Sequence, residues 1–256
     1  MTSGGSLLAR MARLFGARPV SYYAAALVPG VAGVALMTAL FVFILQGGQP
    51  GASDPLSLWR ALSVGGKLLV FAGMFWGIWT PVLLAARTTC RIAVKLLENQ
   101  SVSLATTLVD MVRFVPAALL YSLIFGLASM IGSYILFLPG FFVLSAFTLV
   151  VPSGVLESKG IFATLGRGVS LASRVYGRSV LLVFASAALM VLVMLLRITG
   201  LDRLVSGTPT QVSAFRLALI YLPGLLVLIL ANICFTLLCV DARGMEAASR
   251  PATTPG

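Results

Sequence analysis

The chain has 256 residues, of which 59% are hydrophobic and only 10% are charged, against roughly 25% charged residues in an ordinary soluble domain. It carries 18 basic and 7 acidic residues, a net charge of +11, and no histidine. Histidine is the commonest metal ligand and the usual side chain that titrates near neutral pH. Its absence argues against haem, zinc and hydrolase functions, and we expect no cofactor and no catalytic residues. The length suits one helical bundle without an additional soluble enzyme domain.

More than half of the residues lie in five stretches without any charged side chain. A membrane-spanning helix needs roughly 20 mostly apolar residues, because each residue rises about 1.5 Å through a hydrocarbon layer of ~30 Å. The sequence therefore predicts an all-α integral membrane protein. The uncharged stretches are residues 19–53, 68–86, 114–156, 179–196 and 217–240.

In chain order, residues 1–19 form a predicted cytoplasmic segment, and residues 20–243 form the membrane domain. The first predicted span covers residues 20–45. A polar, glycine-rich loop follows at residues 46–53. The second span covers residues 62–86, and its helix is expected to continue through residues 87–98 beyond the membrane.

The third uncharged stretch has 43 residues, about twice the length that one span requires. Proline cannot donate a backbone hydrogen bond and glycine permits a tight turn, so Pro139 and Gly140 are predicted to form a hinge. This hinge separates spans at residues 114–137 and 141–157. The second of these is short and contains Pro152, a further hinge candidate, so a tilted or re-entrant element is the alternative.

Two more spans, at residues 179–196 and 214–240, bring the predicted count to six. Residues 244–256 are predicted to form a disordered cytoplasmic tail. With six spans, thirteen basic residues fall on the side of the termini and five on the other side. Cytoplasmic loops are enriched in lysine and arginine, which predicts that both termini are cytoplasmic, in the inner membrane of a bacterium.

Two cytoplasmic connections have the pattern of amphipathic helices that lie in the membrane interface, where basic side chains meet anionic headgroups. They are residues 101–115 and 160–178. Each carries an Ala-Thr pair, at Ala105 and at Ala163, and leads into a span. This similarity indicates a parallel internal repeat, with chance likeness between amphipathic connectors as the alternative.

Charged residues near the cytoplasmic ends of the spans are the candidate contacts for lipid headgroups or a protein partner. Glu157 ends the fourth span, and it is either a locally paired terminal charge or an anchor for Arg167 or Arg174. Asp241 and Arg243 end the sixth span, where they either mark the boundary or join the same cluster. The full candidate set is Glu157, Lys159, Arg167, Arg174, Arg178, Asp241 and Arg243.

Residues 138–157 read LPGFFVLSAFTLVVPSGVLE, and Lys159, Gly160 and an amphipathic helix follow them. This order resembles bacterial multi-pass proteins grouped as the membrane domain of glycerophosphoryl diester phosphodiesterase, and related uncharacterised families. Residues 99–104 and the Asp241-Ala-Arg243 sequence agree with it, so the resemblance covers residues 95–245. The chain departs from the family pattern at Gly168, where a serine is usual.

The resemblance implies a helical membrane domain and no phosphodiesterase activity, because that chemistry resembles that of a separate soluble barrel. We expect a non-enzymatic scaffold or accessory subunit that organises lipids or partner proteins at the cytoplasmic face. The alternatives are a transporter or lipid-handling protein with an intramembrane cavity, and a membrane enzyme acting on lipid phosphates. A homo-oligomer is compatible with the sequence. Nucleic-acid binding is not expected, because the arginines lie at span ends rather than on one soluble face.

Overall fold

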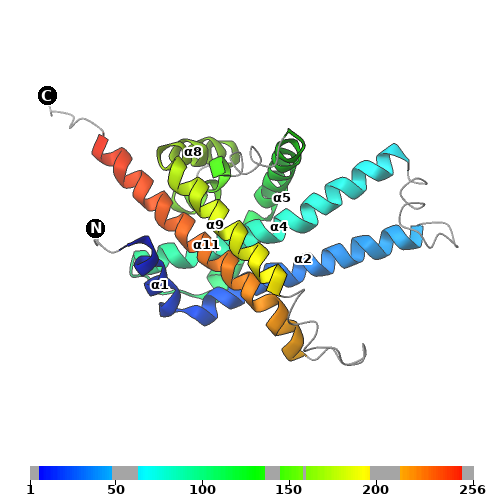
Figure 1. Ribbon diagram of the computed structural model, residues 1–256, viewed down its shortest axis with the longest axis horizontal. Coiled ribbons are helices and arrows are strands. Elements are labelled where there is room, and N and C mark those ends of the chain that lie inside the picture. Colours follow the sequence, from blue (N-terminus) through cyan, green and yellow to red (C-terminus); the bar gives the residue numbers. More distant parts are fainter. Residues whose placement is uncertain (1–5, 48–62, 136–144, 158–159, 197–213, 250–256) are drawn as a thin grey trace.

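The computed structural model describes residues 6–47, 63–135, 145–157, 160–196 and 214–249. Within these ranges the regular elements are helices and no strand occurs. The helices of Figure 1 are α1 (Leu7–Ala17), α2 (Pro19–Gly47), α4 (Val64–Leu97), α5 (Leu104–Ile135), α7 (Val150–Glu157), α8 (Ile161–Arg174), α9 (Tyr176–Leu196) and α11 (Ala214–Ser249).

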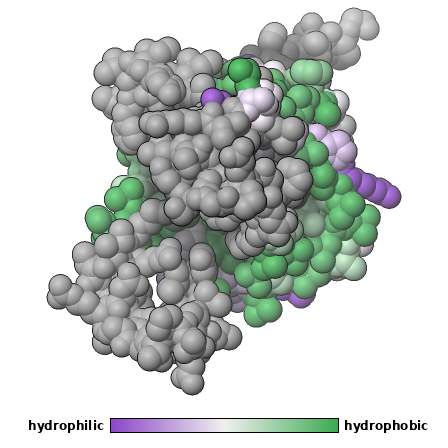
Figure 2. Space-filling view, turned by 90° about the vertical axis from the view of Figure 1, so that its right-hand side faces the viewer, coloured by the Kyte–Doolittle hydropathy of each residue, from purple (hydrophilic) through white to green (hydrophobic). Residues whose placement is uncertain are grey.

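Three stretches of the described helices are long and apolar enough to cross a membrane: Leu104–Leu127, Tyr176–Val193 and Leu222–Ala248. Of the Tyr176–Val193 span only 6% is buried inside the protein. Leu181, Leu189 and Leu192 on this helix are exposed by 71%, 45% and 50%. Such an apolar surface is unfavourable in water and favourable in lipid. Figure 2 shows a mostly hydrophobic surface wherever the described residues face the viewer.

Helix α4 is the centre of the bundle and contributes to two apolar core regions. On one side Cys90 and Val94 pack among residues of α5 and α7, including Tyr121 and Val150. On the other side Ala85 and Ile92 pack with residues of α2 and α11, including Tyr22, Ile229 and Ile233. The two regions explain why α4 is buried on opposite faces over residues 83–94.

Prolines lie inside four of the long helices without ending them: Pro29, Pro81, Pro116 and Pro223. Neighbouring helices re-satisfy or shield the backbone in such positions. At one of them, Gly33 of α2 lies directly against the ring of Pro81 in α4, and a Cβ at Gly33 would be 2.1 Å from Pro81 Cγ. The absence of a side chain on Gly33 therefore lets α2 and α4 approach each other closely.

The predicted helix at residues 101–115 and the internal repeat that depends on it need correction. Residues 101–115 do not form a separate helix, because α5 runs unbroken from Leu104 through Pro116. The first part of α5 is fixed against α4 by an ion pair between Arg87 and Asp110, which keeps it in register with the rest of the helix. The two segments of the proposed repeat therefore differ. Residues 104–115 are part of the long helix α5, whereas α8 ends at Arg174 and a separate helix, α9, begins at Tyr176.

The predicted C-terminal tail also differs from the structure. Helix α11 continues to Ser249, so residues 244–249 are helical rather than part of a disordered tail. The physical reason is the pairing of Glu246 with Arg167, which holds this last part of the helix against α8. The N-terminal segment contains α1, whose Leu14 is buried against the region formed by α2, α4 and α11.

The two predicted hinges have different outcomes. Pro139 and Gly140 lie outside the described residues. Pro152 is inside α7 and buried, as are its neighbours from Val150 to Val155. A proline in the first turn of a helix lacks only a donor that has no intrahelical partner. Pro152 therefore fits α7 near its start and does not interrupt it.

Candidate functional site

The charged residues that the sequence analysis singled out gather at one end of the bundle. Helices α1 and α8, the N-terminal part of α9 and the C-terminal part of α11 lie at this end, on the left in Figure 1. We call it the charged end. Its polar contacts fall into three groups, centred on Arg167, on Arg10 and on Arg87.

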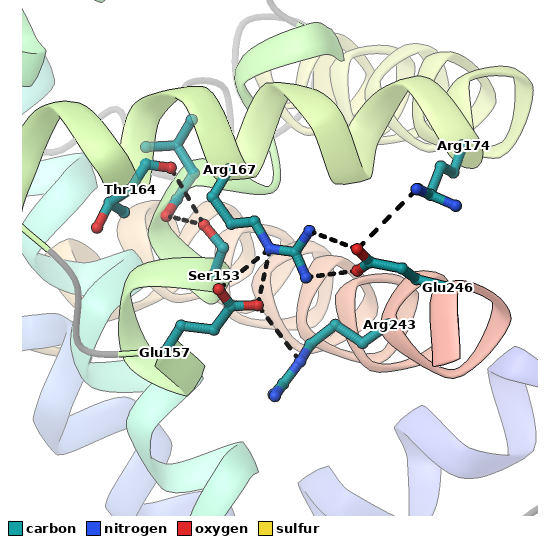
Figure 3. Close-up of polar contacts among 8 residues, drawn as sticks. Ser153, Glu157, Thr164, Arg167, Arg174, Arg243 and Glu246 are labelled. Atoms are coloured by element: carbon teal, nitrogen blue, oxygen red, sulfur yellow. Dashed lines mark hydrogen bonds and ion pairs between the residues drawn. The ribbon is translucent and has the colours of Figure 1, made fainter. Parts of the chain in front are cut away.

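Arg167 of α8 binds two glutamates from two other helices (Figure 3). Its Nε donates to both carboxylate oxygens of Glu157 in α7, at 2.9 and 3.1 Å. Its Nη1 and Nη2 donate to Oε1 and Oε2 of Glu246 in α11, with 3.1 Å for the Nη1–Oε1 contact. Forked contacts between guanidinium and carboxylate are the strongest hydrogen bonds of this kind. Arg167 thereby joins α7, α8 and α11.

Two more arginines complete the cluster from its edges. Arg243 Nε lies 3.5 Å from Glu157 Oε1, and Arg174 Nη2 lies 4.0 Å from Glu246 Oε1. The side chains of Glu157 and Glu246 are only 10% and 13% exposed, whereas Arg174 and Arg243 are 40% and 41% exposed. The glutamates are therefore neutralised internally, and the outer arginines keep about two fifths of their side-chain surface available to the surroundings.

Small residues bring α7 and α8 close enough for this arrangement. A Cβ at Gly168 would lie 2.4 Å from Val150 Cα, which leaves no room for any side chain. A Cβ at Gly154 would lie 2.9 Å from Thr164 Cγ2. The hydroxyl of Ser153 donates to Val150 O at 2.9 Å. Even a serine at position 168 would have no space in this fold.

Helix α8 meets the bundle through a face that differs largely from the apolar stripe of residues 160–178, which is predicted to face the membrane interface. The buried face of α8 consists of Thr164, Gly168, Leu171 and Ala172. The helical period of residues 160–178 puts Phe162 on this apolar stripe, and its side chain is 73% exposed. The same period puts Arg167 on the opposite, polar face, and its side chain points toward the glutamates of α7 and α11. Close packing of small residues, rather than the hydrophobic stripe, decides which face of α8 meets the bundle.

Asp241 does not take part in the Arg167 cluster. Its two carboxylate oxygens accept from Nη1 and Nη2 of Arg10, at 3.0 and 2.6 Å. Arg10 belongs to α1, so this pair attaches the N-terminal helix to α11. The sequence analysis missed Arg10, because the partners lie 231 residues apart and no spacing relates them.

The third group, also missed from sequence, joins α4 and α5. Arg87 Nε donates to Asp110 Oδ2 at 3.0 Å, and the guanidinium carbon lies 4.9 Å from the centroid of the Phe114 ring. Asp110 and Phe114 are four residues apart and share one face of α5, which is the only sequence signal for this contact. The group fixes the N-terminal part of α5 against α4.

The remaining predicted site residues lie apart from these contacts. Arg178 is exposed near the start of α9, and no ion pair involving it occurs among the described residues. Lys159 lies outside the described part of the chain. The structure therefore brings together Glu157, Arg167, Arg174 and Arg243, adds Glu246 to them, and places Asp241 in a separate pair.

The hydrogen bonds from Arg167 to Glu246 and Glu157 raise the pKa of the Arg167 guanidinium. A group whose pKa is raised on folding stabilises the folded state below its ordinary pKa and loses this effect only as the pH rises through the folded value. The cluster should therefore persist in strong alkali. We predict that Arg167→Lys is less stable to heat than the unchanged protein, and that the difference is larger at about pH 11 than at pH 8. The reason is that lysine loses its charge near pH ~10.4.

The comparison is made by thermal unfolding of both proteins in detergent at the two pH values. Titration of the other lysines and tyrosines is common to both chains and cancels in the difference. An equal stability gap at both pH values would show that the charge on residue 167 does not stabilise the fold.

Among the described residues, no group of three or more histidine, cysteine or acidic side chains is placed to hold a metal ion. The fold and the charged end define a class: a helical protein with apolar helices of membrane-spanning length and an arginine-rich polar end. Comparison with family models, curated proteins and solved structures finds no match to this chain.

Proposed function

We propose that the chain is a non-enzymatic, multi-pass protein of a bacterial inner membrane, with six spans and both termini in the cytoplasm. In this proposal the charged end is a platform that contacts anionic lipid headgroups and so organises lipids or a partner protein. The resemblance of residues 95–245 to the glycerophosphoryl diester phosphodiesterase membrane domain belongs to the same proposal.

The observation that carries the proposal is the surplus of arginine at the charged end. Four of the five described acidic residues accept from arginine within the protein, which leaves Glu98 exposed. Basic residues outnumber these acids. Basic side chains near a membrane surface contribute about 1 kcal/mol each to contact with anionic lipid. The described basic residues of this end are Arg10, Arg13, Arg18, Arg87, Arg91, Lys95, Arg113, Arg167, Arg174, Arg178 and Arg243.

One observation weighs against a transporter of polar solutes, and another weighs against a lipid-phosphate enzyme. A transporter needs buried polar side chains that are free to line a solute pathway. Among such side chains here, Thr80 donates to Ser122 Oγ at 3.2 Å and Thr236 donates to Asn232 O at 2.8 Å. The Thr80 and Thr236 hydroxyls are therefore already satisfied by a side chain and by the backbone, so neither is free to bind a polar solute. For a lipid-phosphate enzyme, Asp241 is withdrawn from the Glu157 cluster by its pair with Arg10.

The test compares two triple variants reconstituted into nanodiscs containing phosphatidylglycerol and phosphatidylethanolamine. The first changes Arg13, Arg91 and Arg113 to glutamine, none of which forms an ion pair among the described residues. The matched control changes Arg60, Arg203 and Arg216, which the predicted topology puts on the opposite side.

We expect the first variant to reduce the enrichment of phosphatidylglycerol around the protein by about fivefold or more, since each arginine contributes up to ~1 kcal/mol. The control should change it little. Equal losses in both variants, or no loss in either, would contradict a headgroup platform at the charged end. Lipid turnover unchanged by Glu157→Gln would agree with the absence of catalysis.

A further inference from the structure

We infer that the cavity between α9, α11 and the α4–α5–α7 group binds an acyl chain of an anionic phospholipid. The cavity has a volume of about 310 Å³. It is bounded by Val183, Ala187 and Met190 of α9, by Val227 and Ala231 of α11, and by Trp79 of α4, among others. The acyl-chain contact requires only that the protein lies in a bilayer, and it shares one residue, Arg178, with the charged end.

The lining selects an apolar occupant. Apart from Trp79, the polar side chains among the described lining residues are Thr148, Ser186 and Asn232. Each already has a partner within the protein: Thr148 Oγ1 and Ser179 Oγ are 2.6 Å apart, Ser186 Oγ donates to Leu182 O at 2.8 Å, and Asn232 Nδ2 donates to Leu228 O at 2.8 Å. Sites for polar ligands present convergent polar groups to orient them. Because these polar groups are already hydrogen-bonded to neighbouring atoms, a hydrocarbon chain is the ligand that matches the lining of the cavity.

The dimensions favour one acyl chain over a helix. Along α11 the lining extends from Val227 to Phe235, eight residues or about 12 Å at the α-helical rise. One leaflet of a bilayer provides a hydrocarbon depth of about 15 Å. A partner helix with its side chains is about 10–12 Å wide. The volume of this cavity lies at the lower limit of the ~300–1,000 Å³ range of small-ligand pockets, which is too small to hold such a helix.

The surroundings indicate how the lipid enters and which headgroup suits it. Helix α9 is exposed along most of its length, so the side of the cavity that it forms borders the lipid. Arg178 lies five residues before Val183 on α9, at a level about 7.5 Å nearer the charged end. It is exposed and has no ion pair among the described residues. Its positive charge complements the phosphate of an anionic lipid at this depth.

The experiment uses Trp79 as a reporter inside the cavity. The protein has three tryptophans, and Trp59→Phe with Trp76→Phe leaves Trp79 alone. The purified protein in detergent is titrated with phosphatidylglycerol that carries brominated acyl chains, which quench tryptophan on contact. We expect quenching to saturate near one lipid per chain, with half-saturation at a lower concentration than for brominated phosphatidylcholine.

Two neighbouring alanines on α9 give a matched pair of variants. Ala187 lines the cavity, whereas Ala188 is exposed on the outer side of the helix. Ala187→Phe should raise the half-saturating lipid concentration about tenfold, equivalent to ~1.4 kcal/mol, and Ala188→Phe should leave it unchanged. Ala231→Phe fills the cavity from α11 and replaces the first variant should Ala187→Phe fail to fold.

Several results would overturn the inference. Quenching that rises without saturation, or that is equal in the Ala187→Phe and Ala188→Phe proteins, would mean that lipid only dissolves in the surrounding micelle. Equal affinity for phosphatidylglycerol and phosphatidylcholine would exclude an anionic preference. These outcomes leave the headgroup enrichment in nanodiscs unaffected, so the two proposals fail separately.

Discussion

Replacing Gly168 with alanine should lower the thermal unfolding temperature of the protein in detergent by about 4–8 °C, equivalent to about 2 kcal/mol. The new Cβ would lie 2.4 Å from Val150 Cα and 2.7 Å from Val150 N. Because these are backbone atoms of a buried helix, neither can rotate away as a side chain would. Helices α7 and α8 must separate, and the distance between Arg167 and Glu157 must increase with them.

Gly166 is the matched control for this change. It lies two residues away on α8 and is exposed, and a Cβ added there would meet no atom within 4 Å beyond its own stretch of helix. Alanine favours a helix over glycine by about 0.8–1 kcal/mol, so Gly166→Ala should raise the unfolding temperature slightly. If both variants unfold at the same temperature, α8 does not pack against α7 as described.

Removing the charge of Arg167 should produce the second large effect. In Arg167→Gln, Glu157 and Glu246 retain their negative charges at 10% and 13% exposure and lose their central partner. Hydrogen bonds to charged groups contribute about 1.5–3 kcal/mol, and an unpaired, poorly hydrated carboxylate adds a further penalty. We expect a destabilisation of about 2–3 kcal/mol, measured by thermal or denaturant unfolding in detergent.

The triple variant Arg167→Gln, Glu157→Gln, Glu246→Gln separates charge from shape. Since no carboxylate remains unpaired, it should recover a substantial part of the stability lost in the single variant. Arg178→Gln is the surface control and should change stability by less than about 0.5 kcal/mol. A single variant as stable as this control would show that Arg167 does not hold the three helices together.

The helical membrane class follows directly from the sequence, because a long uncharged stretch forms few stable structures other than a membrane-spanning helix. The span 179–196 matches α9, and the extension of the second span, predicted through residues 87–98, matches α4, which ends at Leu97. Proline was less informative. Pro116 lies within α5, and nothing in the local pattern of residues 101–115 reveals that the helix continues through it. Whether the helix continues through Pro116 depends on the contact between Asp110 and Arg87, and Arg87 belongs to another helix.

The candidate site was predictable where its partners lie close in sequence. Glu157 and Arg167 are ten residues apart on adjacent helices, and their pairing was one of the two interpretations of Glu157. Glu246 was missed because residues 244–256 have no apolar pattern and resemble a tail. Arg10 was missed because its partner is at the other end of the chain. The buried face of α8 depends on Gly168 and Val150, and glycine carries no hydropathy signal for such a contact.

The most direct test of the proposed topology is the labelling of single cysteines by a membrane-impermeant maleimide in intact cells. With Cys90, Cys234 and Cys239 replaced by alanine, Ser63→Cys marks the exposed start of α4, and Ser170→Cys marks the exposed face of α8 at the charged end. We predict that Ser63→Cys reacts in cells with a permeable outer membrane, whereas Ser170→Cys reacts only after the inner membrane is opened. Labelling of Ser170→Cys from outside, or equal labelling of both positions, would contradict a membrane bundle whose arginine-rich end faces the cytoplasm.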